Sequence, residues 1–366
     1  MDDSARVVFC GLCLPVLQLL RRNRVILIFS IKRMQAGHMR PIAGTANTGK
    51  RGLSGLRFGR ILLGLALLFL SYSELGFASE FCRPGDSLWE VSSRGLPDCP
   101  HVSDGQQLEL FQFQQGCWSA QPLGLLREFV SAAIGQRVVI YVHGNRMSQQ
   151  ELHIRAQQVY RRLVSNVRCE PICFIAFSWP SDRSGGLGND VAIKKLRLNV
   201  DAYYLASFVQ SLEFQRPIGY LGYSFGSAVI CGAHHLLAGG TLNGYQLSAL
   251  PTQLYQDRIS LIAPAFDRQS LTAYGRYSQA LVGVEKVVNL YNSIDPILKR
   301  FRFFDRNTSP IAAGFAGILD PSSTSPLNAD QRIIQFDCRC IGRTHAELDY
   351  HSSSCAVYAF QNVVGQ

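Results

Sequence analysis

The sequence lacks the patterns that mark several classes of protein. Residues 79–366 contain no Cys-x-x-Cys pair and no spacing of histidine and cysteine that is typical of zinc ligands, so we expect no structural metal site there. After residue 80 it has no internal repeat, low-complexity run or linker. Residues 79–366 are therefore predicted to form one folded domain.

A basic cluster interleaved with aromatic side chains is also missing from the body of the chain. The net charge is +10, but residues 1–79 contain 11 Lys and Arg against 3 Asp and Glu. Residues 80–366 contain 25 against 23, which is close to balance. The basic character belongs to the N-terminal leader, and we expect no nucleic-acid partner.

The leader, residues 1–78, has the sequence features of an export signal. The apolar block 61–72 (ILLGLALLFLSY) follows four basic residues between positions 50 and 60. Small residues stand at positions 76 and 78, which a signal peptidase reads. These features predict a cleaved signal peptide, with the mature chain beginning at Ser79. An uncleaved membrane anchor across 61–78 stays open, so the expected location is secreted, periplasmic or membrane-anchored.

Cysteine usage is in keeping with export. Nine cysteines follow the leader, and an oxidising compartment would let some of them pair. Their number is odd, so at least one stays free, and the connectivity does not follow from the sequence.

Apolar runs and helical patterns alternate along the body of the chain. Two early runs, 88–94 and 108–113, alternate apolar and polar residues as half-buried strands do. Denser runs follow and predict buried strands at 138–142, 173–179, 217–222, 259–263, 287–291 and 333–336. Helical patterns are found at 123–133, 152–163, 190–212, 225–237 and 353–363. This order predicts an α/β fold, with a mostly parallel sheet covered by helices on both faces.

The segment Gly222-Tyr-Ser-Phe-Gly226 joins one of these strands to a helix. The pattern Gly-x-Ser-x-Gly between a strand and a helix is typical of a nucleophile elbow, which exposes the serine oxygen at the end of a sheet. The turn is crowded, so we expect glycine at both ends. Ser224 is therefore the candidate nucleophile.

A serine hydroxyl needs a base within hydrogen-bond reach, and the base needs an acid. His345 lies between the last predicted strand and the C-terminal helix, which favours it over His351, the alternative base. Asp295 follows an apolar strand and precedes a proline, which favours it over Asp267 as the acid. Functional groups gather at the carboxyl ends of parallel strands, so these residues can meet Ser224 there.

Two backbone N–H groups are candidates for an oxyanion hole. One belongs to Phe225, directly after the nucleophile, and the other to Asn145, directly after His143-Gly144. Losing one such donor typically costs about 3–4 kcal/mol of transition-state stabilisation. We interpret His143 as a residue that holds this loop, and a brace for the loop is the alternative role for the Asn145 side chain.

Taken together, Val142-His-Gly-Asn145, Ser178-Trp-Pro180, the elbow, Ser293-Ile-Asp-Pro296 and a late histidine resemble the alpha/beta-hydrolase superfamily. The resemblance covers about residues 85–364 and is nearest to predicted bacterial hydrolases with the first two motifs. It implies a serine hydrolase that uses Ser224, Asp295 and His345 without metal or organic cofactor, on carboxylic ester or lipid-like substrates. A catalytically silent binding protein and a peptidase or amidase stay open. The loops 181–189 and 301–330 are expected to wall the substrate pocket.

Overall fold

The computed structural model describes residues 81–99, 107–132, 135–251, 253–304, 309–319 and 332–366. Residues Cys82–Gln366 form one compact unit. The leader, with its apolar segment 61–78, lies outside the described residues, so the signal peptide and the anchor stay predictions. Among the helices that are described, none has the length and apolar character of a membrane span.

A nine-stranded sheet runs through this unit in the order β3-β2-β1-β5-β4-β6-β7-β8-β9. Within it, β2 pairs antiparallel with both of its neighbours, and the other described pairings are parallel. The strands are β1 (Ser87–Ser92), β2 (Glu109–Gln114), β3 (Cys117–Gln121), β4 (Arg137–Val142), β5 (Ile172–Ser178), β6 (Gly219–Tyr223), β7 (Asp257–Ile262), β8 (Val284–Tyr291) and β9 (Ile333–Asp337). The α/β class predicted from the sequence is confirmed.

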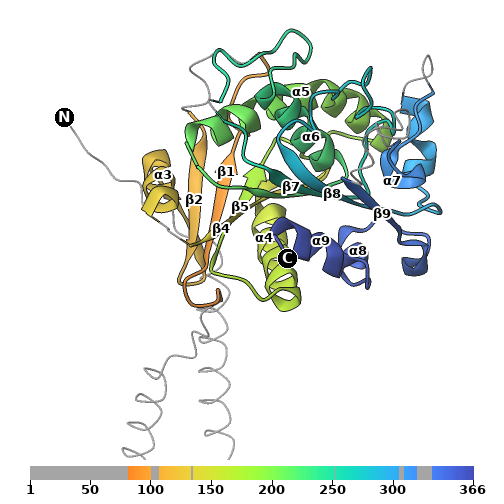
Figure 1. The fold of residues 1–366 in the computed structure, drawn as a ribbon. Helices are drawn as coiled ribbons and strands as arrows, with labels where there is room; N and C mark the ends of the chain where they lie inside the picture. The colour runs from red at the N-terminus through yellow and green to blue at the C-terminus, as the bar shows by residue number, and fades with distance from the viewer. Residues whose placement is uncertain (1–80, 100–106, 133–134, 252, 305–308, 320–331) are drawn as a thin grey trace, which may run out of the picture. The chain divides into compact units, whose positions relative to one another are not determined.

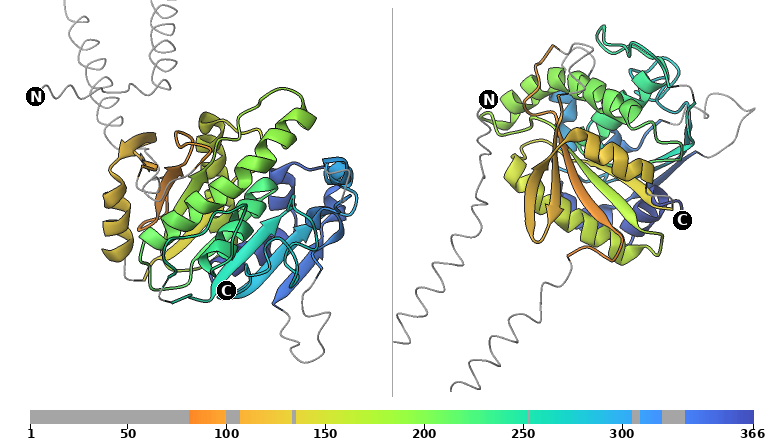
Figure 2. Two further views of the ribbon diagram at one scale, coloured as in Figure 1. Left: turned by 90° about the horizontal axis from the view of Figure 1, so that it is seen from above. Right: turned by 90° about the vertical axis from the view of Figure 1, so that its left-hand side faces the viewer.

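Helices cover both faces of the sheet, as Figure 1 shows. The helices α5 and α6 lie on one face, and α4, α8 and α9 on the other. Viewed from above, the long helix α5 lies in front of the sheet (Figure 2). The helices are α3 (Leu123–Ala132), α4 (Gln149–Asn166), α5 (Leu187–Ser211), α6 (Phe225–Leu237), α7 (Ala313–Ala316), α8 (Glu347–His351) and α9 (Ala356–Val363).

The core lies between these layers. Every residue of β5 is buried, and so is every residue of β1. Helix α6 is buried along its whole length between the sheet and α5. Strands covered on both faces read as continuous apolar runs, which is why β4 and β5 were predicted so closely.

The structure differs from the predicted elements at two places. Strand β3 was not predicted, because its residues are exposed or half-buried and carry no apolar alternation. The helix predicted at 353–363 is present as α9, but the short helix before it, α8, was not predicted. His351 is consequently the last residue of α8, rather than a neighbour of the start of the C-terminal helix.

The strand order reverses at the middle of the sheet. From β4 the chain moves to β5 on one side and then crosses to β6 on the other. In open α/β sheets, ligands bind outside the carboxyl ends of the strands at such a switch point. The residues that follow β4 and β6 are therefore the first place to look for a site.

Candidate active site

Ser224 lies at that switch point, between β6 and α6. Its backbone has φ 52° and ψ −117°, a conformation that non-glycine residues rarely adopt and that is often found at functional sites. The turn is held on both sides, since the Ser224 N–H donates to Ile262 O (2.9 Å) and Ser224 O accepts from the Ala265 N–H (3.1 Å). The strained turn is thus fixed by the last residue of β7 and by the segment that follows it.

The elbow is as crowded as the sequence predicted. A Cβ added to Gly226 would lie 2.1 Å from Val142 O and 2.6 Å from His143 O. One added to Gly222 would lie 2.9 Å from the Cα of Ser227. These neighbours are backbone atoms of β4 and α6, so neither position has room for a side chain.

Ser224, His345 and Asp295 form one hydrogen-bonded chain. Ser224 Oγ lies 3.1 Å from His345 Nε2, and His345 Nδ1 lies 2.6 Å from Asp295 Oδ2. The Ser224 residue is 7 % exposed and the Asp295 residue 0 %. The structure therefore brings together the three side chains that the sequence singled out, at the carboxyl ends of β6 and β8 and in the loop after β9.

The Asp295 carboxylate is fixed by backbone donors. Its Oδ1 accepts the N–H groups of Ile297 (2.8 Å) and Leu298 (3.0 Å), at the start of a 3₁₀ helix, Leu298–Phe304 (η2). Its Oδ2 faces His345 and also lies 3.4 Å from the Tyr350 hydroxyl. With one oxygen held in this way, the other is oriented toward the imidazole.

Two residues that the sequence analysis did not single out hold the His345 loop. The hydroxyl of Tyr223, the residue before the nucleophile, donates to the main-chain carbonyl of His345. The Asn292 amide, just after β8, donates to Gly342 O (2.9 Å) and Thr344 O (3.3 Å). The elbow and the acid's loop thus both position the base.

A buried ionic group lies under the same loop. Glu347 accepts from the Tyr141 hydroxyl (2.8 Å) and from Arg155 (2.6 Å). Burial raises the pKa of Glu347, while the positive charge of Arg155 acts in the opposite direction. The group ties α8 to β4 and α4, and so fixes the segment that directly follows His345.

The alternative base and acid are placed elsewhere. His351 is 3 % exposed, and neither ring nitrogen has a hydrogen-bond partner in the described part of the chain. Burial lowers the pKa of His351 to about 3. Asp267 Oδ1 accepts the Gln269 N–H at 3.1 Å and caps its own turn. The geometry favours His345 and Asp295 over both.

The loop after β4 approaches the elbow closely. A Cβ on Gly144 would lie 2.7 Å from the Tyr223 ring and 3.3 Å from Ser224 Cβ. Phe225 is the first residue of α6, where N–H groups have no carbonyl partner within the helix. The Asn145 side chain does not brace the loop, because both its polar atoms are buried without a partner among the described residues.

His143 holds this loop, as the sequence predicted. Its Nε2 accepts the Trp179 N–H (3.2 Å), its Nδ1 contacts Gly144 O (2.8 Å), and its main-chain oxygen accepts from the Trp179 indole (2.8 Å). The two rings stack at 5.5 Å. Burial lowers the pKa of His143 to about 3, so it stays neutral and donates through Nδ1.

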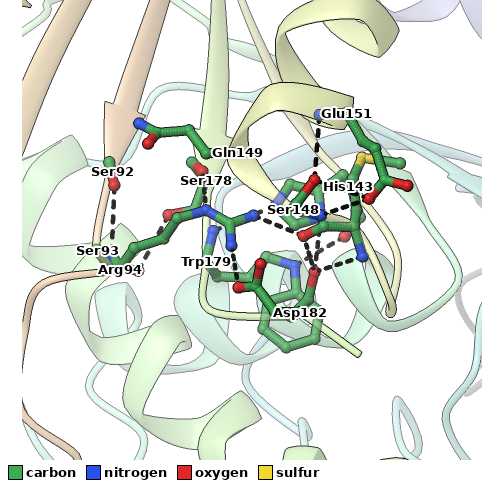
Figure 3. Close-up of polar contacts among 12 residues, drawn as sticks. Ser92, Ser93, Arg94, His143, Ser148, Gln149, Glu151, Ser178, Trp179 and Asp182 are labelled. Atoms are coloured by element: carbon green, nitrogen blue, oxygen red, sulfur yellow. Dashed lines mark hydrogen bonds and ion pairs between the residues drawn. The ribbon is translucent and has the colours of Figure 1, made fainter. Parts of the chain in front are cut away.

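Arg94 joins three segments at this edge of the sheet, as Figure 3 shows. The guanidinium donates to Ser178 Oγ (2.7 Å), to Asp182 (2.5 Å) and to Met147 O (2.8 Å). Arg94 lies just after β1. Met147 follows β4, Ser178 is the last residue of β5, and Asp182 follows β5. No sequence pattern indicated this role, because the partners lie more than 50 positions away.

A cavity of about 360 Å³ adjoins the elbow. Phe225 and Ala265, which flank Ser224 in space, are part of its wall, together with residues of α5 and of the segment 265–277. Phe301 and Pro310 come from the predicted wall 301–330, whereas the described part of the other predicted wall, 181–186, contributes none of the lining. Residues of 265–277, which the sequence analysis did not place in a pocket wall, also line the cavity.

Among the described residues, no group of three or more His, Cys, Asp and Glu side chains is arranged to hold a metal ion. None of the nine cysteines after the leader is joined to another by a disulfide in the structure. The chain matches no known family model, and it matches no curated protein.

Proposed function

We propose that the chain is a serine hydrolase with the alpha/beta-hydrolase fold, and that it forms an acyl-enzyme on Ser224. One observation carries the proposal, namely the hydrogen-bonded chain from Ser224 Oγ to His345 Nε2 (3.1 Å) and from His345 Nδ1 to Asp295 Oδ2 (2.6 Å). Its place at the carboxyl ends of a mostly parallel sheet, on a strained strand–turn–helix, supports the same function.

The first half of the reaction begins with His345. Its Nε2 takes the proton of Ser224 as Oγ attacks the substrate carbonyl carbon, and Asp295 stabilises the imidazolium that forms. The oxyanion accepts hydrogen bonds from the main-chain N–H groups of Phe225 and Asn145. The tetrahedral intermediate then collapses, and His345 gives its proton to the leaving alcohol.

The second half repeats these roles with water. His345 takes a proton from water, the hydroxide attacks the acyl carbon, and the proton returns to Ser224 Oγ as the acid leaves. None of these steps calls for a metal or an organic cofactor. The largely apolar cavity beside Ser224 supports carboxylic ester or lipid-like substrates, because a volume of about 360 Å³ is in the range of small-molecule sites.

The proposal includes export, which rests on the leader sequence alone. The mature protein is then secreted or periplasmic, or anchored to the membrane through residues 61–78. N-terminal sequencing of the protein from its native host tests this point. A mature terminus near Ser79 supports cleavage, and a retained leader supports the anchor.

A panel of p-nitrophenyl esters beside p-nitroanilide amides tests the activity. We expect ester hydrolysis by the wild type and by Ser165→Ala, a control at an exposed serine of α4, and none by Ser224→Ala. Hydrolysis of the amides alone would indicate a peptidase or amidase. A folded protein that cleaves neither class would indicate a catalytically silent binding protein.

A further inference from the structure

The cavity beside Ser224 has an apolar wall and a polar corner. The apolar part includes Leu198, Phe266 and Tyr277, and Phe225 joins it to the nucleophile. The polar corner is formed by Asn199 of α5 and Arg276 of the segment after β7. A substrate that reaches from Ser224 into this cavity meets both.

Asn199 has a buried donor without an acceptor. The residue is 2 % exposed, and its Oδ1 accepts from the Arg276 guanidinium at 2.7 Å. Because Arg276 can only donate, this contact fixes the orientation of the amide and leaves Nδ2 as the free end. Nδ2 has no hydrogen-bond partner among the described residues. A buried donor that is unsatisfied is unfavourable, so the site is one that an acceptor on a ligand would complete.

The charge around this donor favours an anion. Arg276 is exposed where it lines the cavity, and it also contacts Asn243 Oδ1 at 3.4 Å. Among the described lining residues, two side chains are cationic, Arg276 and Lys195, and one, Asp267, carries a carboxylate. A planar carboxylate, with two acceptor oxygens, suits an amide N–H and a guanidinium side by side.

We propose that the substrate is an ester that carries a carboxylate on an apolar chain, bound by Asn199 Nδ2 and Arg276. This inference rests on the proposed hydrolase function. The chain fills the apolar part of the cavity, and the ester carbonyl lies at Ser224. The carboxylate belongs to either the acyl or the alcohol half of the ester, and the two halves are distinguished by experiment.

Three matched esters provide the test. Pentyl hexanoate is the neutral reference, monopentyl adipate carries a carboxylate in the acyl half, and 4-carboxybutyl hexanoate carries it in the alcohol half. We expect kcat/KM, measured by titration of the released acid, to be about tenfold or more higher for one of the two carboxylates than for the neutral ester. Asn199→Leu and Arg276→Gln should bring this ratio close to one. Arg168→Gln, at an exposed site near the opposite end of the sheet, should keep it.

The inference is overturned if wild type hydrolyses all three esters equally, or if both variants keep the preference. The hydrolase function survives either result, because the neutral ester is still cleaved. Since Asn199 is buried, the exposed Arg276→Gln carries the test if Asn199→Leu does not fold. If no ester is cleaved, the hydrolase function fails, and calorimetry with Ser224→Ala still decides the site. Equal affinities for the three intact esters would then refute it, and tighter binding of a carboxylate ester would support it.

Discussion

Replacing Asp295 by asparagine tests the assignment of the acid, because the structure dictates which tautomer of His345 results. In the wild type, Oδ1 of Asp295 accepts two backbone N–H groups, from Ile297 and Leu298. An asparagine keeps these bonds only if its oxygen takes that place. Its NH₂ group then faces His345 Nδ1, where the wild type has an acceptor 2.6 Å away.

An NH₂ group at this place forces Nδ1 to accept and moves the imidazole proton to Nε2. The Nε2 atom, 3.1 Å from Ser224 Oγ, then carries a proton and cannot act as the base. The cost for such a change of tautomer in a serine triad is about 10⁴-fold in kcat, which corresponds to about 5.5 kcal/mol. We expect a loss of this order, with KM changed little, since the carboxylate does not contact the substrate.

The assay is steady-state hydrolysis of a p-nitrophenyl ester by wild type, Asp295→Asn and Asp267→Asn, with thermal melting to show that each variant is folded. Asp267 is the alternative acid, in the segment after the neighbouring strand β7, and its substitution should cost far less. A folded Asp295→Asn variant with activity within about tenfold of wild type would refute the tautomer argument. A loss in Asp267→Asn as large as that in Asp295→Asn would show that the acid is wrongly assigned.

Three further predictions concern the base, its support and the turn. His345→Ala should lower kcat by about 10³-fold or more, whereas His351→Leu should leave the catalytic rate within a few-fold. Burial holds the pKa of His351 at about 3 in the folded state, against an ordinary value of 6.5. The stability that depends on a neutral His351 is therefore fully present above pH 6.5 and is lost as the pH falls toward 3. In His351→Leu the melting temperature should consequently fall less steeply between pH 7 and pH 4 than in the wild type. Tyr223→Phe removes the hydroxyl that holds the His345 carbonyl, and should lower kcat by about tenfold with an unchanged KM. Gly226→Ala, whose Cβ would lie 2.1 Å from a backbone oxygen, should lower the free energy of unfolding by about 3 kcal/mol or more, or prevent folding. Gly95→Ala is the matched control, because no atom lies within 4 Å of a Cβ at that position. Equal melting curves for the two variants would contradict the claim that the elbow has no room for a side chain at Gly226.

Much of the fold was predictable because its signals are local. The strands β4 to β8 are buried on both faces, so each reads as a short apolar run, and α6 begins at Phe225 and ends at Leu237 as predicted. Strand β3 gave no such signal, because it pairs only with β2 at the sheet edge and its side chains are half-buried or exposed. Helix α8 was missed because its five residues, Glu347–His351, are too few to show a helical pattern.

The three central residues of the site were predictable because each follows a strand or a defined motif. Their order along the chain, with the nucleophile first, the acid second and the base last, favoured this assignment. The groups that hold them were not predictable in the same way. Asn292 and Tyr223 act through contacts with the His345 loop over about 50 and 122 positions, and Arg94 reaches segments 53 to 88 positions away. Such contacts depend on the packed sheet, not on spacing, so only the structure reveals them.

The central claim is that Ser224 is a nucleophile activated by His345, and covalent trapping tests it most directly. A fluorophosphonate reacts with an activated serine and leaves a stable phosphonyl adduct in place of fluoride. We predict one adduct per folded chain by intact mass, located on Ser224 by peptide mapping, and none on Ser224→Ala. A folded wild-type protein that stays unlabelled, or that carries the adduct on another residue, would contradict the account.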